Sequence, residues 1–178
     1  MPGFGGKAIV SAGFMRLLFA LLFALLLPPC APAVAAAEST GLPLPRFVSL
    51  RSDPINLRSG PGERYPVDWV YSRRHLPVEV VAEFETWRKI RDWEGTEGWV
   101  HQSLLSGQRT VLITGQTRAL RAGADDGAAI VALVEPGVIG RLSQCPLDDG
   151  YCRVDLGSLR GWLRRDEFYG LYDGENLE

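Results

Sequence analysis

The fold is decided by a short stretch that the chain contains twice. Asn56-Leu57-Arg58-Ser59-Gly60 is matched by Ala119-Leu120-Arg121-Ala122-Gly123 at an offset of 63 residues, and Gly98-Trp99-Val100 is matched by Gly161-Trp162-Leu163 at the same offset. Ordered matches at such a spacing indicate tandem duplication of a small domain with its own core, because solenoid repeats are shorter. The sequence therefore predicts two small domains in succession.

Around the first copy, short β-favouring runs alternate with turns. The runs that we expect to form strands are Phe47 to Leu50, Val67 to Tyr71, Val78 to Phe84, Thr86 to Arg91 and Gly98 to His101. No window has a long apolar period of about 3.6 residues, so the pattern favours an all-β fold with at most short 3₁₀ turns. Such turns are expected after each closing strand, at Ser103 to Leu105 and Asp166 to Phe168.

The composition excludes several classes of protein. The 178 residues contain 19 Lys and Arg against 21 Asp and Glu, and 46% are hydrophobic. A disordered polyelectrolyte, a collagen and a strongly basic nucleic-acid binder have other compositions. Residues 1–37 hold no acid and two bases, so the remaining 141 residues carry 17 bases and 21 acids, a net charge of −4. We expect a mildly acidic chain with no nucleic-acid partner.

The first 37 residues have the three-part layout of a secretory signal. Arg16 precedes Leu17 to Leu27, eleven residues of Leu, Phe and Ala, and a small-residue tract follows. Eleven helical residues cover only about half of a hydrocarbon layer that is about 30 Å thick. We expect cleavage between Ala37 and Glu38 and export to a Gram-negative-type periplasm, with no stable membrane span afterwards.

Two alternatives stay open for this segment. An uncleaved segment would anchor the chain in the inner membrane. The true start is either Met1 or Met15, since the residues between them add little that a signal needs.

Two cysteines remain in the exported chain, because Cys30 leaves with the signal. An even pair in an exported protein favours a disulfide, here between Cys145 and Cys152. Asp148-Asp149-Gly150 between them is turn chemistry, so the two sulfurs would face each other across a hairpin. The second copy has one Trp where the first has four, and the disulfide would compensate for its poorer core.

The ordered motifs resemble those of the bacterial SH3-like (SH3b) domain family, whose fold is a small barrel of five or six strands. The motifs that carry the resemblance are Asn56 to Gly62, Trp87-Arg88-Lys89-Ile90-Arg91 and Gly95 to Val100. The second copy is weaker, with Ala119 for the opening Asn and Tyr151 for the Trp. The resemblance implies two tandem SH3-like barrels behind an N-terminal signal helix. The expected division is a signal at 1–37, a linker at 38–45, domains at 46–107 and 110–170, and a tail at 171–178.

Each family motif has a physical interpretation. Asn56 is suited to cap a turn through its side chain. Gly98 and Gly161 allow the close backbone approach with which a small barrel closes. Trp99 and Trp162 recur in the closing strand of both copies, and we expect both to lie in the core.

Residues for catalysis are not gathered in this sequence. His75 and His101 lie in different segments without metal-ligand spacing, and no phosphate loop or nucleophile elbow occurs. No catalytic domain remains once the signal and both copies are subtracted. We expect no enzyme activity, no metal and no cofactor.

Aromatic side chains of the first copy are the candidates for binding. In a strand, Trp87, Lys89 and Arg91 share one face and Ile90 lies on the other. An exposed Trp beside cations suits stacking on a sugar ring or peptide side chain. The candidate contact residues are Tyr65, Trp69, Tyr71, Trp87, Lys89 and Trp93.

The leading hypothesis is a non-enzymatic module of the cell envelope that binds cell-wall (peptidoglycan) peptide or glycan, or an extended segment of a partner protein. The alternative is a structural role, in which the barrels dock on each other or on an envelope complex without a small ligand. In that case Trp87 and Trp93 merely cover the end of the barrel.

Overall fold

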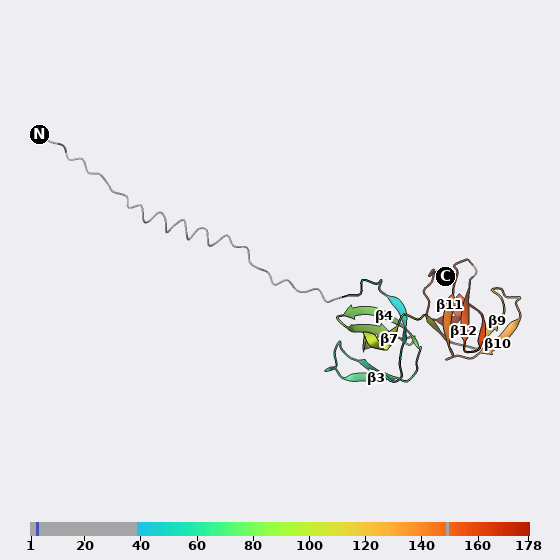
Figure 1. Cartoon of the computed structure of the whole chain (residues 1–178), viewed down its shortest axis with the longest axis horizontal. Coiled ribbons are helices and arrows are strands. Elements are labelled where there is room, and N and C mark those ends of the chain that lie inside the picture. Colours follow the sequence, from blue (N-terminus) through green and yellow to red (C-terminus); the bar gives the residue numbers. More distant parts are fainter. Residues whose placement is uncertain (1–2, 4–38, 149) are drawn as a thin grey trace. The chain divides into compact units, whose positions relative to one another are not determined.

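The computed structural model describes residues 3, 39–148 and 150–178 of the chain. The expected signal peptide, its cleavage position at Ala37 and Glu38, and Cys30 lie outside the described residues. In the part that the structure describes, no helix is long and apolar enough to cross a membrane. The described residues from Ser39 onward belong to one compact unit, which is built from strands (Figure 1).

The first domain is a seven-stranded antiparallel sheet. Its elements are β1 (Arg46–Leu50), β2 (Ile55–Arg58), β3 (Val67–Tyr71), β4 (Pro77–Phe84), β5 (Trp87–Arg91), β6 (Glu97–His101), the 3₁₀ helix η2 (Gln102–Leu104) and β7 (Leu105–Ser106). The strand order is β3-β2-β6-β5-β4-β1-β7. All five strands expected from the sequence are present, and β3 has the expected bounds.

The second domain repeats the first strand by strand. Its elements are β8 (Thr110–Ile113), β9 (Arg118–Arg121), β10 (Ile130–Val134), β11 (Ile139–Gln144), β12 (Tyr151–Leu156), β13 (Leu159–Arg164), η3 (Arg165–Glu167) and β14 (Phe168–Tyr169). The order β10-β9-β13-β12-β11-β8-β14 is that of the first domain with each strand replaced by its counterpart. The all-β prediction, the duplication and the two 3₁₀ turns are confirmed.

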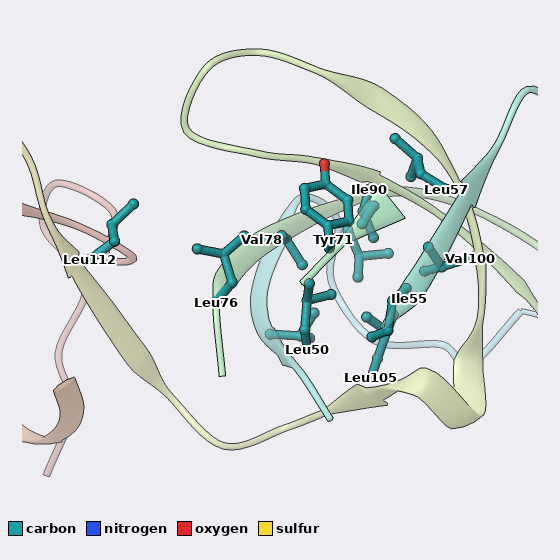
Figure 2. Packing of buried hydrophobic residues seen from close by; sticks show 12 residues of the cluster. Leu50, Ile55, Leu57, Tyr71, Leu76, Val78, Ile90, Val100, Leu105 and Leu112 are labelled. Atoms are coloured by element: carbon teal, nitrogen blue, oxygen red, sulfur yellow. The ribbon is translucent and has the colours of Figure 1, made fainter. Parts of the chain in front are cut away.

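Each domain has its own core cluster. In the first, Leu50, Ile55, Leu57 and Ile90 are almost completely buried, and Figure 2 shows their side chains converging between the strands. A Cβ on Gly98 would lie 2.5 Å from Cγ of Leu57, and one on Gly161 would lie 2.7 Å from Cγ of Leu120. The two glycines are therefore required for close packing at the same place in both domains, as the sequence indicated.

The two closing tryptophans are not in the core, which corrects one expectation. Gly98 and Val100 are the buried residues of β6, so Trp99 between them lies on the opposite face and is only half-buried. Trp162 lies in the same way between Gly161 and Leu163 on β13.

Asn56 also differs from its expected role. It is exposed within β2, opposite Val70 of β3, and so continues a strand instead of capping a turn.

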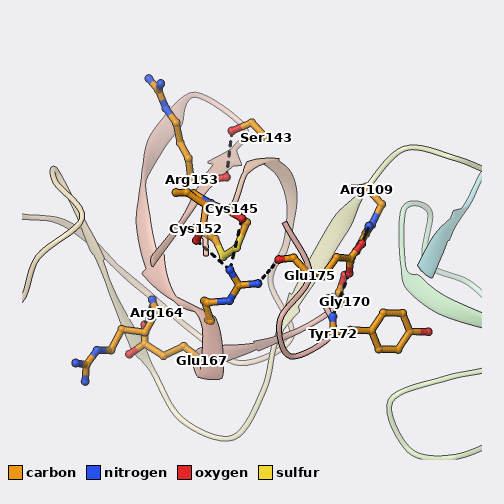
Figure 3. The surroundings of a disulfide bond; sticks show 12 residues. Arg109, Ser143, Cys145, Cys152, Arg153, Arg164, Glu167, Gly170, Tyr172 and Glu175 are labelled. Carbon is orange, nitrogen blue, oxygen red and sulfur yellow. Dashed lines mark hydrogen bonds and ion pairs between the residues drawn. A yellow bond between two sulfur atoms is a disulfide. The ribbon is translucent and has the colours of Figure 1, made fainter. Parts of the chain in front are cut away.

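The disulfide between Cys145 and Cys152 is present and both residues are completely buried (Figure 3). They belong to the second core cluster, together with apolar residues such as Leu120, Val154 and Leu163. The C-terminal segment closes over this site, because the backbone N–H of Cys145 donates to the carbonyl of Leu177 at 2.6 Å and Leu177 donates back at 3.1 Å. The tail is thus part of the second domain's packing.

The segment before β1 has no regular structure, as expected for a linker, but it is tied to the first domain. The backbone N–H and the hydroxyl of Thr40 each donate to the carboxylate of Glu83 at 2.7 Å. Arg46 donates to the same carboxylate at 2.6 Å, and Arg88 lies 3.3 Å from it. The exposed fraction of the Glu83 side chain is 2%, so this is a buried ionic cluster.

The two domains contact each other through apolar and aromatic side chains. Leu112 of β8 belongs to the core cluster of the first domain (Figure 2). The ring of Phe47 meets those of Tyr169 and Tyr172 at centroid distances of 5.0 Å and 4.5 Å. The hydroxyl of Tyr169 donates to the carbonyl of Arg91 at 3.4 Å.

Candidate binding surface

Strand β5 has the alternation that the sequence predicted. Arg88 and Ile90 are buried, whereas Trp87, Lys89 and Arg91 are partly exposed on the outer face. Trp87 is thereby presented on the same outer face as two cations, with Lys89 as the nearer one.

Strand β6 extends this outer face. Trp87 is opposite His101, with the ring centroids 5.7 Å apart and the planes at 83°. Lys89 is opposite Trp99, and the exposed Phe84 of β4 is opposite Trp87. We call these five residues, Phe84, Trp87, Lys89, Trp99 and His101, the β5–β6 face.

Acidic residues compensate the cations of this face. Nζ of Lys89 lies 2.5 Å from Glu97, and Arg91 lies 2.5 Å from Glu79. The hydrogen bond from Lys89 holds the pKa of Glu97 below its usual value. Because these charges are already paired, the aromatic rings are what the β5–β6 face offers to a ligand.

Tyr65 has a structural contact at a turn. Its ring lies over Gly60, where a Cβ would come within 2.4 Å of a ring carbon. Its carbonyl accepts a 2.8 Å hydrogen bond from Arg58, and the equivalent Arg121 donates to the carbonyl of Ala128 at 3.2 Å. The arginine of the repeated motif therefore fixes the same turn in both domains, and part of the Tyr65 ring stays accessible.

Tyr71 is not a surface residue, which corrects its assignment as a contact. It is 4% exposed, and its hydroxyl donates to Asp92 at 2.9 Å. Burial raises the pKa of Tyr71 well above its usual value. Asp92 also accepts hydrogen bonds from the backbone N–H groups of Glu94 and Thr96, so the phenol supports the β5 to β6 turn.

The two other tryptophans are exposed but lie apart from the β5–β6 face. Trp69 is 54% exposed on the edge strand β3, beside the exposed Val67 and Val70. Trp93 is 36% exposed and comes just after the C-terminal end of β5, whereas Trp87 is at the N-terminal end of that strand. The candidate residues therefore do not form one continuous site; only Trp87 and Lys89 are brought together on one face.

Sequence reasoning missed three members of that face. Trp99 was expected in the core, and neither His101 nor Phe84 was among the candidate contact residues. The signal was present in Gly98-Trp99-Val100-His101, because alternate residues of a strand face opposite sides and a glycine that must approach Leu57 faces inward.

The described residues contain no group of three His, Cys, Asp or Glu side chains that could hold a metal ion. His75 lies in a turn with φ of 65°, and His101 bonds Ser103 through Nδ1 at 2.7 Å, so the two histidines have separate surroundings.

Two tandem antiparallel β domains of identical strand order, each with a Gly-Trp pair at the same position in an interior strand, define the class of protein: a duplicated small β domain. The sequence profile of the bacterial SH3 domain matches residues 51–107 and 115–170. The chain belongs to this family, and the resemblance stated from the motifs is confirmed in both copies.

Solved structures to which the chain is matched include NlpC1 from Trichomonas vaginalis, with 10% identity, a TM-score of 0.34, and coverage of 80% of this chain and 51% of that one. NlpC2 from the same organism has 9% identity, a TM-score of 0.33, and coverage of 74% and 50%. The chain thus spans about half the length of these proteins. Among curated proteins, none matches the sequence.

Proposed function

We propose that this protein is an exported, non-enzymatic binding module of the bacterial cell envelope, and that the β5–β6 face of the first domain holds cell-wall peptide or glycan, or an extended partner segment. Bacterial SH3 domains are generally binding modules of the envelope. The observation that carries the proposal is the pair of partly exposed indole rings, Trp87 and Trp99, on adjacent strands beside Lys89.

These rings are not needed to complete the core. The buried cluster of the first domain is made by aliphatic residues and Tyr71, and neither indole belongs to it. Flat rings on an outer sheet surface offer a large contact area at little conformational cost, with an N–H for hydrogen bonding. This suits a sugar ring or a peptide side chain.

Export is supported by the paired cysteines, because disulfides persist in oxidising compartments. The apolar run from Leu17 to Leu27 supplies the signal in this proposal.

A structural role is the second candidate, favoured by the contacts of Phe47 with Tyr169 and Tyr172. In that role the docked domains form a rigid body for an envelope complex. It predicts a stable dimer or a co-purifying partner.

Co-sedimentation of the purified protein with cell-wall sacculi distinguishes the two. We expect Trp87→Ala to abolish sedimentation without lowering the thermal midpoint, and Trp69→Ala, a matched exposed Trp on β3, to retain it. Equal loss of fold and binding in Trp87→Ala, or binding unaffected by it, would contradict the proposed function.

A further inference from the structure

The outer face of the second domain has a charge pattern opposite to that of the first. In the first domain, Arg91 lies between Glu79 and Glu97 as cross-strand partners on β4, β5 and β6. The corresponding row on β11, β12 and β13 is Arg141, Asp155 and Arg160, in which an acid lies between two arginines. Every charge in this row is reversed.

The reversal leaves an excess of positive charge. In the first domain the row and the adjacent Lys89 hold two cations and two acids, and the ion pairs join them. In the second domain the counterpart of Lys89 is Arg153, opposite Trp162 as Lys89 is opposite Trp99. Three arginines against one aspartate leave a formal charge of +2 on this face.

Two of these arginines have no partner for their guanidinium groups within residues 39–148 and 150–178. Asp155 is bound by Nε of Arg160 at 2.5 Å. Among the residues that the structure describes, Arg141 and Arg153 form no side-chain hydrogen bond or ion pair. Figure 3 shows the Arg153 side chain extending away from the disulfide, with only its backbone carbonyl bound, by Ser143.

The same arginines line two adjoining open hollows. One, of about 470 Å³, is lined by Arg141, Asp155, Gly157, Ser158, Leu159 and Arg160. The other, of about 280 Å³, shares Arg141, Asp155 and Arg160 and adds Ser143, Gln144 and Arg153. Together they form one groove across three strands, which we call the arginine groove.

We infer that the arginine groove binds an acidic peptide segment in extended conformation. Guanidinium groups match carboxylates through two parallel hydrogen bonds. Arg141 and Arg153 are diagonal neighbours on the adjacent strands β11 and β12, about 7 to 8 Å apart. Carboxylates two residues apart in an extended peptide are about 7 Å apart, so the two long arginine side chains can reach both. Ser143 and Gln144 supply polar groups for the peptide backbone, and Leu159, 42% exposed, supplies an apolar contact.

Neither hollow has an aromatic ring in its lining, although Trp162 lies beside them, opposite Arg153. A peptide is favoured over a sugar polymer because a ligand in the hollows meets charged groups, whereas proteins hold sugars by stacking them on aromatic rings. This site is separate from the β5–β6 face and goes beyond the proposed function. Its ligand pairs with charges, whereas that of the first domain stacks on rings.

The test is a titration of the purified protein with a labelled decapeptide of alternating Glu and Gly, followed by fluorescence anisotropy. We expect Arg141→Glu with Arg153→Glu to weaken binding at least about tenfold, while Arg74→Glu with Arg51→Glu, a matched change of exposed arginines in the first domain, leaves it unchanged. Binding should weaken as salt rises, since the charges are exposed. Near-UV circular dichroism checks that both variants are folded.

Three results would overturn the inference. The first is an equal loss of peptide affinity in both double variants. The second is tighter binding of a peptide of alternating Gln and Gly than of the Glu and Gly peptide, and the third is tighter binding of an oligogalacturonate of equal charge than of the Glu and Gly peptide. The double variant Arg141→Glu with Arg153→Glu is also tested for co-sedimentation with sacculi. Trp87 is intact in this variant, so failure of the peptide to bind can be distinguished from failure of the proposed function.

Discussion

Replacing Glu83 by Gln tests the buried cluster that ties the segment before β1 to the first domain. Burial acts to raise the pKa of Glu83, but hydrogen bonds from Thr40 and Arg46 and the charge of Arg88 outweigh it and lower the pKa from 4.5 to about 2. Since the folded pKa lies below the unfolded one, the ionised carboxylate stabilises the fold above about pH 4.5, and this contribution is lost as the pH falls toward 2.

The size of the effect follows from the same two values. The difference between 4.5 and about 2 corresponds to about 3 kcal/mol in the free energy of unfolding. Removal of one partner from a buried ion pair costs about 3 to 5 kcal/mol, a range that overlaps this value. The variant also leaves the guanidinium of Arg88, which is 4% exposed, without its counter-ion.

Urea denaturation followed by tryptophan fluorescence, at pH 7 and at pH 3, measures the contribution. We expect Glu83→Gln to lower the free energy of unfolding by about 3 kcal/mol at pH 7 and by clearly less at pH 3. At pH 3 the ionised carboxylate of the wild type contributes less than half of its stabilisation at pH 7. Glu97→Gln is the control, because its ion pair with Lys89 is exposed and should contribute less than about 1 kcal/mol. A Glu83→Gln variant as stable as wild type at pH 7, or a loss of equal size at both pH values, would refute the reasoning.

Three further predictions concern the fold. Gly98→Ala should lower the free energy of unfolding by about 1 to 3 kcal/mol through overpacking, whereas Gly107→Ala, with open space around its Cβ position, should lower it by less than about 1 kcal/mol. Urea denaturation midpoints measure both, and equal losses of stability would contradict the packing argument. Reduction of the pair Cys145 and Cys152 should destabilise the second domain by about 2 to 3 kcal/mol, seen as a lower thermal midpoint in reductant, and free thiols in non-reducing mass analysis would contradict the pairing. Tyr71→Phe should lower the free energy of unfolding by about 1 kcal/mol, because it removes a buried hydrogen bond, and should leave co-sedimentation with sacculi unchanged. Loss of co-sedimentation in a folded variant would show that Tyr71 contributes to ligand binding.

Local patterns were sufficient to predict five of the seven strands of the first domain, but not β2 or β7. β-favouring runs between turns located β3 with its observed bounds, and the offset of 63 residues predicted that the second domain would follow the first. The motifs also identified the family, because the residues that close the barrel are fixed by packing. Gly98 is an example, since any side chain there would collide with Leu57.

The candidate site was less predictable, because alternation shows which residues share a face but not which face is buried. Trp99 was expected in the core because it recurs with Trp162 in both copies, and Tyr71 was counted as a contact only as one of the aromatic residues of the first copy. Their positions were decided by partners distant in sequence, the packing of Gly98 on Leu57 and the carboxylate of Asp92. The Glu83 cluster joins residues up to 43 positions apart, and no local pattern indicated it.

The two copies differ in a way that separates structural residues from binding residues. Arg58 and Arg121 make the same hydrogen bond to a turn carbonyl in both domains, so the duplicated chain retained what the fold requires. The charged cross-strand row differs between the copies: the buried Glu79 is replaced by the exposed Arg141, and the exposed Glu97 by the exposed Arg160. An acidic segment should be attracted to the second domain, whereas the face of the first domain, on which two cations are paired with two acids, should not attract it. The duplication therefore provides two surfaces of different chemistry on one chain, and a single ligand class for both would be inconsistent with their charges.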